Sequence, residues 1–204
     1  MNSSLTGIGL AFAAGAAAWT LVEHLLHNHL GHHGRGRNPF GKEHMRHHAT
    51  TSYFAPTGKK ARAATPAVLL AWLICALAIG PVIGTAFAVG LAAMYVGYEV
   101  VHRRAHTHPP RGAYGRWLRR NHFHHHFLSP KTNHGVTTPI WDYVFGTHRE
   151  VAGPIRVPAK HAMTWLVDPA TGRVRDEFAA DYVLAGRGAA EPPPALEGTV
   201  ALAA

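Results

Sequence analysis

The chain has 204 residues and a mass of 22.0 kDa, which is enough for one domain. Hydrophobic residues make up 47% of it and charged residues only 15%, whereas charged residues are about 25% of a typical soluble domain. The single cysteine excludes a disulfide scaffold and a cysteine-ligated zinc or iron–sulfur site, because these need several thiols. Histidine is the unusual residue, since 18 histidines outnumber the 11 acidic residues.

The first candidate membrane span is residues 5–26, a nearly continuous apolar stretch whose one charged residue is Glu23. It exceeds the roughly 20 residues that a spanning helix needs. A cleaved signal peptide is the alternative, because Ala16–Ala18 resembles a cleavage site. A signal peptide would have a basic region in front of the apolar stretch, and this sequence has none there. We therefore interpret the segment as a retained span.

A second apolar block breaks at Gly80-Pro81 into residues 65–79 and 82–101. Proline lacks the N–H group that a continuing helix requires, so the break predicts the turn of a helical hairpin. Fifteen helical residues rise only about 22 Å, against a hydrocarbon core of about 30 Å. The first arm therefore either tilts in a thinned bilayer or begins earlier, near Lys60. A soluble hairpin is the alternative, which the lack of charge before Glu99 disfavours.

Positive charge is confined to two parts of the chain. The net charge is +9 and the isoelectric point is about 10.2, but all 20 Lys and Arg residues lie in 35–62 or 103–187. Apolar segments bordered by basic ones follow the positive-inside pattern of membrane proteins. Both basic segments lie on one side of the predicted spans, and the pattern makes that side cytoplasmic. We expect this face to meet an anionic leaflet, and we expect no nucleic-acid partner.

These observations predict an all-α membrane protein with about three transmembrane helices and a cytoplasmic helical cap. The membrane domain is expected to be residues 1–153, with the cap formed by 27–62 and 102–153. Residues 154–204 contain several prolines and are predicted to be a cytoplasmic extension whose end, from about Ala185, is disordered. We expect the arginines near the start of the second cap segment to meet lipid phosphates or, less simply, an acidic electron donor: Arg111, Arg116, Arg119 and Arg120.

Seventeen of the 18 histidines fall in two windows, 24–48 and 102–148, which begin where predicted spans end. Each window holds one His-x2-His-His triplet, and positions i, i+3 and i+4 share a helix face. The triplets are His44, His47 and His48, and His122, His125 and His126. His102 and His106 form an i, i+4 pair on one face.

The remaining pair, His24 and His29, has a spacing of five residues, which diverges by about 140° on a regular helix. The helix must therefore unwind there, and His27 competes with His29 for the second position. We interpret His32, His33, His148 and His161 as ordinary surface histidines. A pH sensor is an alternative use of histidine, but it does not need repeated triplets.

Two chelating groups at a membrane edge predict a dimetal site in the cap, with about five imidazoles for each ion. Imidazole suits Zn, Cu, Fe and Ni alike, so the residues do not choose the metal.

The pattern resembles the fatty acid hydroxylase/sterol desaturase superfamily of membrane di-iron oxygenases. That family has a His-x3/4-His box, a His-x2-His-His box, a membrane hairpin, a His-x3-His box and a final His-x2-His-His box, and the chain has all four in this order. Tyr98 to His102 is similar to the lead-in to the third box. Asn133, Gly135 and the stretch Trp141 to Thr147 are similar to the closing Trp-Asp-x-x-Phe-Gly-Thr signature. Histidine boxes also occur in acyl-CoA desaturases, alkane hydroxylases and carotenoid hydroxylases, so this signature is what favours the superfamily.

The resemblance covers about residues 20–150 and implies ten metal ligands: His24, His29, His44, His47, His48, His102, His106, His122, His125 and His126. Carboxylates often orient metal-bound imidazoles, and Glu99, Asp142 and Glu23 are the candidates. Glu99 shares the helix face of His102 and His106, whereas Asp142 is also a candidate helix cap. The roles of His27, His124 and His134 stay open.

The implied activity is hydroxylation of a lipid C–H bond, in a fatty acyl chain above all, with two iron ions and O2 as co-substrate. Zinc can occupy such ligands in a purified protein. A fused cytochrome b5-like domain, which some relatives carry, is not recognised in the sequence, so we expect a separate electron donor of ferredoxin or cytochrome b5 type. The alternatives are a sterol or carotenoid hydroxylase or desaturase, and a histidine-rich metal-handling membrane protein without redox chemistry. We expect an integral protein of the bacterial cytoplasmic membrane with its active site on the cytoplasmic side.

Overall fold

The structure is a computed structural model, and it describes residues 4–186. Most of the predicted disorder at the C-terminal end therefore lies outside the described residues. Within this range, three helical segments are long and apolar enough to cross a membrane, Leu5–His33, Thr57–Ile79 and Pro81–Thr107. The predicted class, a largely helical membrane protein with three candidate spans, is confirmed. The second segment begins even before Lys60, so its 23 residues reach about 34 Å without a thinned bilayer.

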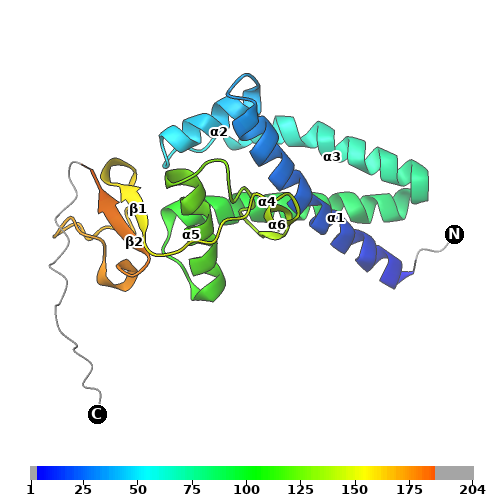
Figure 1. Cartoon of the computed structure of the whole chain (residues 1–204). Helices are drawn as coiled ribbons and strands as arrows, with labels where there is room; N and C mark the ends of the chain where they lie inside the picture. The colour runs from blue at the N-terminus through cyan, green and yellow to red at the C-terminus, as the bar shows by residue number, and fades with distance from the viewer. Residues whose placement is uncertain (1–3, 187–204) are drawn as a thin grey trace, which may run out of the picture.

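Helix α1 (Leu5–Leu25) crosses α4 (Pro81–Thr107) at very close range (Figure 1). A Cβ atom on Gly15 would lie 2.0 Å from the backbone oxygen of Phe87, and one on Gly90 would lie 2.0 Å from that of Phe12. Helices in a membrane gain little from hydrophobic burial, because lipid tails are as apolar as the side chains, so their association depends on close van der Waals packing. Small residues such as glycine allow the two backbones to approach that closely. Trp19 packs against α4 further along, with its ring 4.7 Å from that of Tyr95.

Helix α3 (Thr57–Ile79) returns directly into α4 through Gly80 and Pro81. Gly80 has a φ of +98°, which favours glycine, and Pro81 occupies the first turn of α4, where its missing N–H costs nothing. A Cβ atom on Gly84 would lie 2.6 Å from the backbone nitrogen of Ala76. The two arms are therefore in tight contact near the turn, as the sequence predicts.

The cap is built from shorter elements beyond the ends of α1 and α4. Helix α1 continues into the π-helix η1 (Leu26–His33), followed by α2 (Pro39–Ala49), and α5 (Gly112–Phe127) and α6 (Ile140–Val144) follow α4. The Asn38 side chain accepts a hydrogen bond from the N–H of Gly41 and thereby caps α2.

Three of the four arginines expected to meet lipid phosphates or an electron donor are bound within the protein. Arg119 is buried and donates to the backbone oxygens of Arg104 and His108 at the end of α4, at 2.8–3.1 Å. Arg116 and Arg120 pair with Asp181 at 3.2 and 2.7 Å. The end of a helix exposes unpaired carbonyl groups, and a buried guanidinium satisfies several of them at once.

The C-terminal segment differs from the all-α expectation, because it contains a small parallel sheet. Strands β1 (Ile155–Pro158) and β2 (Tyr182–Ala185) pair with Ile155 opposite Tyr182, and two short 3-10 helices lie between them, Ala159–His161 and Asp176–Phe178. The sheet lies at the opposite end of the molecule from the start of α1 (Figure 1).

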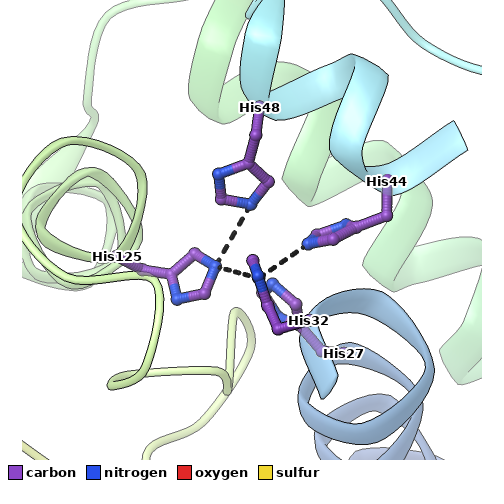
Figure 2. A group of neighbouring side chains, drawn as sticks. All are labelled: His27, His32, His44, His48 and His125. Carbon is purple, nitrogen blue, oxygen red and sulfur yellow. Dashed lines mark hydrogen bonds between the residues drawn. The ribbon is translucent and has the colours of Figure 1, made fainter. Parts of the chain in front are cut away.

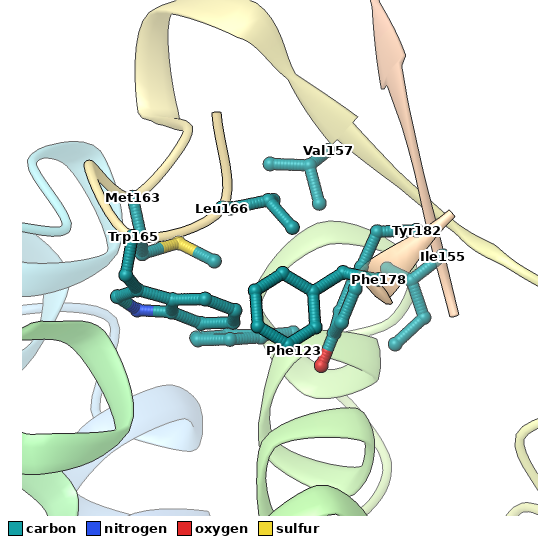
Figure 3. Close-up of a cluster of buried hydrophobic side chains, with 8 residues drawn as sticks. All are labelled: Phe123, Ile155, Val157, Met163, Trp165, Leu166, Phe178 and Tyr182. Carbon is teal, nitrogen blue, oxygen red and sulfur yellow. The ribbon is translucent and has the colours of Figure 1, made fainter. Parts of the chain in front are cut away.

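A compact apolar cluster joins this segment to α5 (Figure 3). Phe123 of α5 is fully buried in it, and its ring lies 6.2 Å from Trp165 and 6.1 Å from Tyr182. Trp165 also donates through Nε1 to the backbone oxygen of His106 at 3.2 Å. The segment therefore packs behind α5, whose histidine face points the other way. The boundary near residue 153 stays a prediction.

Candidate metal centre

Ten imidazoles gather into two groups of five at the cap end of the long helices, and the possible ligand atoms within each group lie within 4.8 Å of one another. The first group contains His27, His32, His44, His48 and His125. The second group contains His47, His102, His106, His122 and His126. Eight of the ten predicted ligands are therefore brought together, and each predicted triplet is divided between the groups.

The first group is drawn from η1, α2 and α5, and its rings point toward a common centre (Figure 2). Two pairs of rings face each other across that centre, His27 with His48 at 6.5 Å and His44 with His125 at 6.4 Å between centroids. His32 lies 4.6–5.3 Å from each of the other four. Four rings in a square with a fifth above them form a square pyramid, and none of the five occupies the position opposite His32.

The second group has the same kind of arrangement. His47 and His122 face each other at 6.5 Å between ring centroids. His106 lies 4.6–5.5 Å from the other four rings, which makes it the apical member. The two groups are in contact, because His47 and His48 are neighbours on α2, and His48 stacks on His126 at 4.0 Å.

The separations between ring nitrogens fit metal coordination. Nε2 atoms lie 2.9 Å apart between His32 and both His44 and His125, and 2.9 Å apart between His106 and His122. Two nitrogens bound about 2.1 Å from one ion at a right angle would be about 3.0 Å apart. Among the described residues, Nε2 of His27 and Nε2 of His126 are buried without a hydrogen-bond partner. Leaving such atoms unpaired is costly, and a metal ion in each group would bind them.

Burial keeps these rings in the neutral form that metals bind. For the cap residues outside the long helices, burial lowers the pKa of His47 to about 4 and that of His48 to about 2, and neighbouring rings lower the pKa of His48 further. Burial and the neighbouring histidines also hold the pKa values of His122, His125 and His126 well below the usual value. Metal binding therefore need not displace a proton from these rings at neutral pH.

Backbone carbonyl groups orient several of the rings. His47 donates from Nδ1 to the oxygen of Tyr53 at 2.8 Å, and His125 donates from Nδ1 to the oxygen of Thr132 at 2.7 Å. His27 likewise donates from Nδ1 to the oxygen of His134. These bonds fix the tautomer, so that Nε2 of each ring is left as the free donor atom for a metal.

The three candidate carboxylates have different positions. Glu99 pairs with Lys60 of α3, away from the imidazoles. Glu23 accepts from the backbone N–H groups of Val136 and Thr137 and from the Thr137 hydroxyl, at 2.6–3.0 Å.

Asp142 accepts from the N–H groups of His134 and Gly135 and from the Thr147 hydroxyl, at 2.7–2.8 Å. Burial alone would raise the pKa of Asp142, but its hydrogen bonds and the adjacent His134 outweigh burial and lower it. Glu23 and Asp142 thus hold the loop whose carbonyls orient the first group, and only Asp142 also lies near imidazoles.

The first histidine pair lies three residues later than expected. His24 lies outside both groups, beside Asp142 and His134, and His29 is exposed. The unwinding predicted here takes the form of a π-helix, in which the N–H of Gly34 bonds the oxygen of His29 five residues earlier. In a π-helix, positions i and i+5 lie on one side, and the pair that uses this spacing is His27 and His32.

His32 was expected to be an ordinary surface residue, although His27 and His32 have the same spacing of five residues as His24 and His29. The signal that separates them is Gly31. A Cβ atom there would lie 2.9 Å from Cδ2 of His44, so the glycine marks the turn that faces α2. His124 and His161 lie outside both groups.

The fold and this site define a class of membrane protein with histidine boxes at the end of a helical hairpin. Consistent with this, the model of the fatty acid hydroxylase family matches residues 12–147. The chain belongs to the fatty acid hydroxylase family.

The relatives include a dihydroceramide fatty acyl 2-hydroxylase of Arabidopsis thaliana, 30% identical over 144 residues that cover 69% of this chain and 61% of that protein. The fatty acid 2-hydroxylase of Homo sapiens is 32% identical over 67% of this chain and 38% of its own length. The solved structure of full-length scs7p, in which only the hydroxylase domain is visible, matches with a TM-score of 0.60 and 26% identity, over 76% of this chain and 60% of that one. The chain thus matches less than two thirds of each of these proteins.

Proposed function

We propose that the protein is a membrane-bound, non-haem di-iron oxygenase that hydroxylates a fatty acyl chain of a lipid. The observation that carries this proposal is the pair of touching five-imidazole groups, each arranged as a square pyramid around a common centre. The names of the relatives support an acyl substrate over a sterol or a carotenoid, and they support carbon 2 as the oxidised position.

The donor set fits two transition-metal ions, because it offers only neutral imidazoles and includes buried nitrogens that lack another partner. The first group would hold one ion and the second group the other. When bound, two iron ions supply the reductive activation of O2 that attack on an unactivated C–H bond requires. We therefore place the ligand role on His27 and His32 rather than on His24 and His29.

The chain's own residues hold and shelter this centre. The carbonyls of Tyr53, Thr132 and His134 fix the ring orientations, so each ring is positioned before an ion binds. His122 and His125 are 1% and 0% exposed, which excludes water from that side of the site.

An acyl chain has an apolar approach to the first group. Leu30, Phe40 and Met45 are exposed by 40–43% on η1 and α2, the two elements that supply four of its five rings. Phe40 stacks on His44 at 6.0 Å between centroids. Exposed apolar side chains beside a span fit contact with the bilayer, from which a lipid enters.

Electrons would come from a separate donor protein of ferredoxin or cytochrome b5 type. The basic segments that flank the spans support a cytoplasmic position for the cap, where such donors are found. We place the protein in the bacterial cytoplasmic membrane.

The test is lipid mass spectrometry of cells that express the wild type or His125→Ala under ¹⁸O₂. We expect a fatty acyl chain that gains one labelled oxygen at carbon 2 only with the wild type. His161→Ala, a change outside both groups, should leave the product unchanged. Identical lipid profiles for the wild type and His125→Ala, in iron-replete cells that supply an electron donor, would contradict the proposal and favour a metal-handling protein.

A further inference from the structure

A third group of possible ligands lies beside the first group and belongs to neither set of five. It consists of His24 in the last turn of α1, His134 in the loop after α5, and Asp142 in α6. Their side chains are 1%, 1% and 0% exposed. The end of α1 and the much later stretch from residue 134 to residue 142 thus bring two imidazoles and a carboxylate together in the protein interior.

The ligand atoms of this group lie within 4.8 Å of one another. Nδ1 of His24 lies 3.5 Å from Oδ1 of Asp142, and Nδ1 of His134 lies 3.6 Å from the same oxygen. The two rings meet edge to face at 5.5 Å. Ligand atoms about 2.1 Å from one ion at a tetrahedral angle would be about 3.4 Å apart. The observed separations are too long for good hydrogen bonds, but they suit an ion between the three atoms.

Buried ring nitrogens without hydrogen-bond partners also favour a bound cation. Within residues 4–186, Nδ1 of His24 and both ring nitrogens of His134 are buried without a hydrogen-bond partner. In the same residues no Lys or Arg pairs with Asp142, and its ionic partners are these two histidines. Its hydrogen bonds from two backbone N–H groups and the Thr147 hydroxyl hold Asp142 as a carboxylate, so the site carries a buried negative charge. A cation at this point would both bind the free nitrogens and balance the carboxylate.

We propose that His24, His134 and Asp142 form a third metal site, which binds a divalent transition-metal ion. Two imidazoles and one carboxylate suit Zn²⁺, Co²⁺ or Fe²⁺, and they are too few in oxygen for Ca²⁺ or Mg²⁺. The site adjoins the first group, with His125 and His27 5.3 and 5.5 Å from the His134 ring, but its three ligand atoms form a set of their own that shares no residue with that group. It goes beyond the proposed function, although the expected metal count assumes that the two groups of five each bind an ion.

The test is a metal count on the purified full-length chain in detergent. The protein is stripped with a chelator, loaded with Co²⁺, freed of excess metal and analysed for metal per chain by mass spectrometry, with the visible Co²⁺ spectrum as a second readout. We expect three ions for the wild type and two for His24→Phe and for His134→Phe. His29→Phe changes an exposed histidine outside every group, so this control should keep three.

The metal counts decide whether a metal ion or a protonated imidazole balances the charge of Asp142. Two ions in the wild type and two in both variants would overturn the proposal and leave a protonated imidazole as the counter-charge of Asp142. His134→Phe can also disturb the first group, because the backbone oxygen of His134 accepts from His27. If the His134→Phe protein binds fewer than two ions, the result for His24→Phe decides alone. Two ions bound to His24→Phe support the third site, and three ions overturn it. The metal count also distinguishes failure of the dimetal proposal from failure of the third site. If the two groups of five bind no ions, the wild type would hold at most one ion, and His125→Ala would not lower that number.

Discussion

The ring of His27 donates a hydrogen bond to the backbone carbonyl of His134, 107 positions later in the chain. The acceptor lies in the loop between α5 and α6, and two residues earlier the carbonyl of Thr132 accepts from His125 in the same way. This loop therefore orients two members of the first group from outside it. The loop is held in turn by buried carboxylates, which explains why a signature without histidines accompanies the histidine boxes.

Replacement of Glu23 tests this support. In Glu23→Leu the buried N–H groups of Val136 and Thr137 lose their acceptor, and each such loss costs about 1–3 kcal/mol. We expect a lower unfolding temperature and a metal affinity that falls more for the first group than for the second, measured by competition with a chelator. Glu23→Gln keeps one oxygen for both N–H groups and should rescue most of the effect. Equal loss from both groups would argue for general unfolding instead.

The identity of the first histidine pair gives a second prediction. His32→Ala removes the apical ring of the first group, so we expect at least a tenfold loss of metal affinity at that group and loss of hydroxylation. His29→Ala removes an exposed ring and should change neither quantity. The measurements are metal content after dialysis and product formation by each purified variant. A stronger effect of His29→Ala would restore the pair expected from the sequence.

The sequence predicts the ligands correctly where the segment is a regular α-helix, and less well where the number of residues per turn changes. The triplet on α2 and the triplet on α5 follow the regular helical period, so the predicted ligands there do meet, although the triplets split between two groups. The π-helix breaks that period, and His27 and His32 have the same spacing as His24 and His29, so the periodicity does not separate the two pairs; Gly31 does, but only once its contact with α2 is known. Glu99 shows a second limit of sequence-based prediction. Its position on the helix predicts that it lies near His102, but it pairs with Lys60 of the neighbouring helix, which the sequence alone does not reveal. The small sheet depends on pairing between residues 155 and 182, which four-residue strands do not predict.

Gly31 gives a third prediction, because its position allows the approach of α2. In Gly31→Ala the new Cβ atom would lie 2.9 Å from Cδ2 of His44, so the ring must shift by several tenths of an ångström. We expect the first group to lose metal affinity while the second group keeps it, as seen by metal content and by the Co²⁺ spectrum. Gly9→Ala adds the same atom in open space and serves as the control. Full metal content in Gly31→Ala would show that α2 moves freely enough to accommodate the change.

The buried neutral rings predict how the metal-free protein responds to pH. An unfolded histidine has a pKa of about 6.5, whereas burial lowers the pKa of His47 to about 4 in the folded protein. Between these values the unfolded chain binds more protons, so the free energy of unfolding rises with pH and the stabilisation is complete only above about pH 6.5. We expect the unfolding temperature of the metal-free protein to fall steadily from pH 7 to pH 5. His47→Gln removes one of several such rings and should make that dependence less steep, and a protein that becomes more stable in acid would contradict it.

The close crossing of α1 and α4 gives a fifth prediction. Gly15→Ala and Gly90→Ala each place a Cβ atom 2.0 Å from a backbone oxygen of the other helix, and the helices must separate to relieve the overlap. Overpacking of this kind costs about 1–3 kcal/mol, so both variants should unfold at lower temperature in detergent. Gly97→Ala lies on the same helix as Gly90 with nothing within 4 Å, and it should be neutral or slightly stabilising because alanine favours a helix. Because α1 continues into η1, which carries His27, and α4 carries His102, a separation of the two helices should also weaken metal binding by both groups. Intact stability in both glycine variants would show that the helices cross at a greater distance than the structure describes.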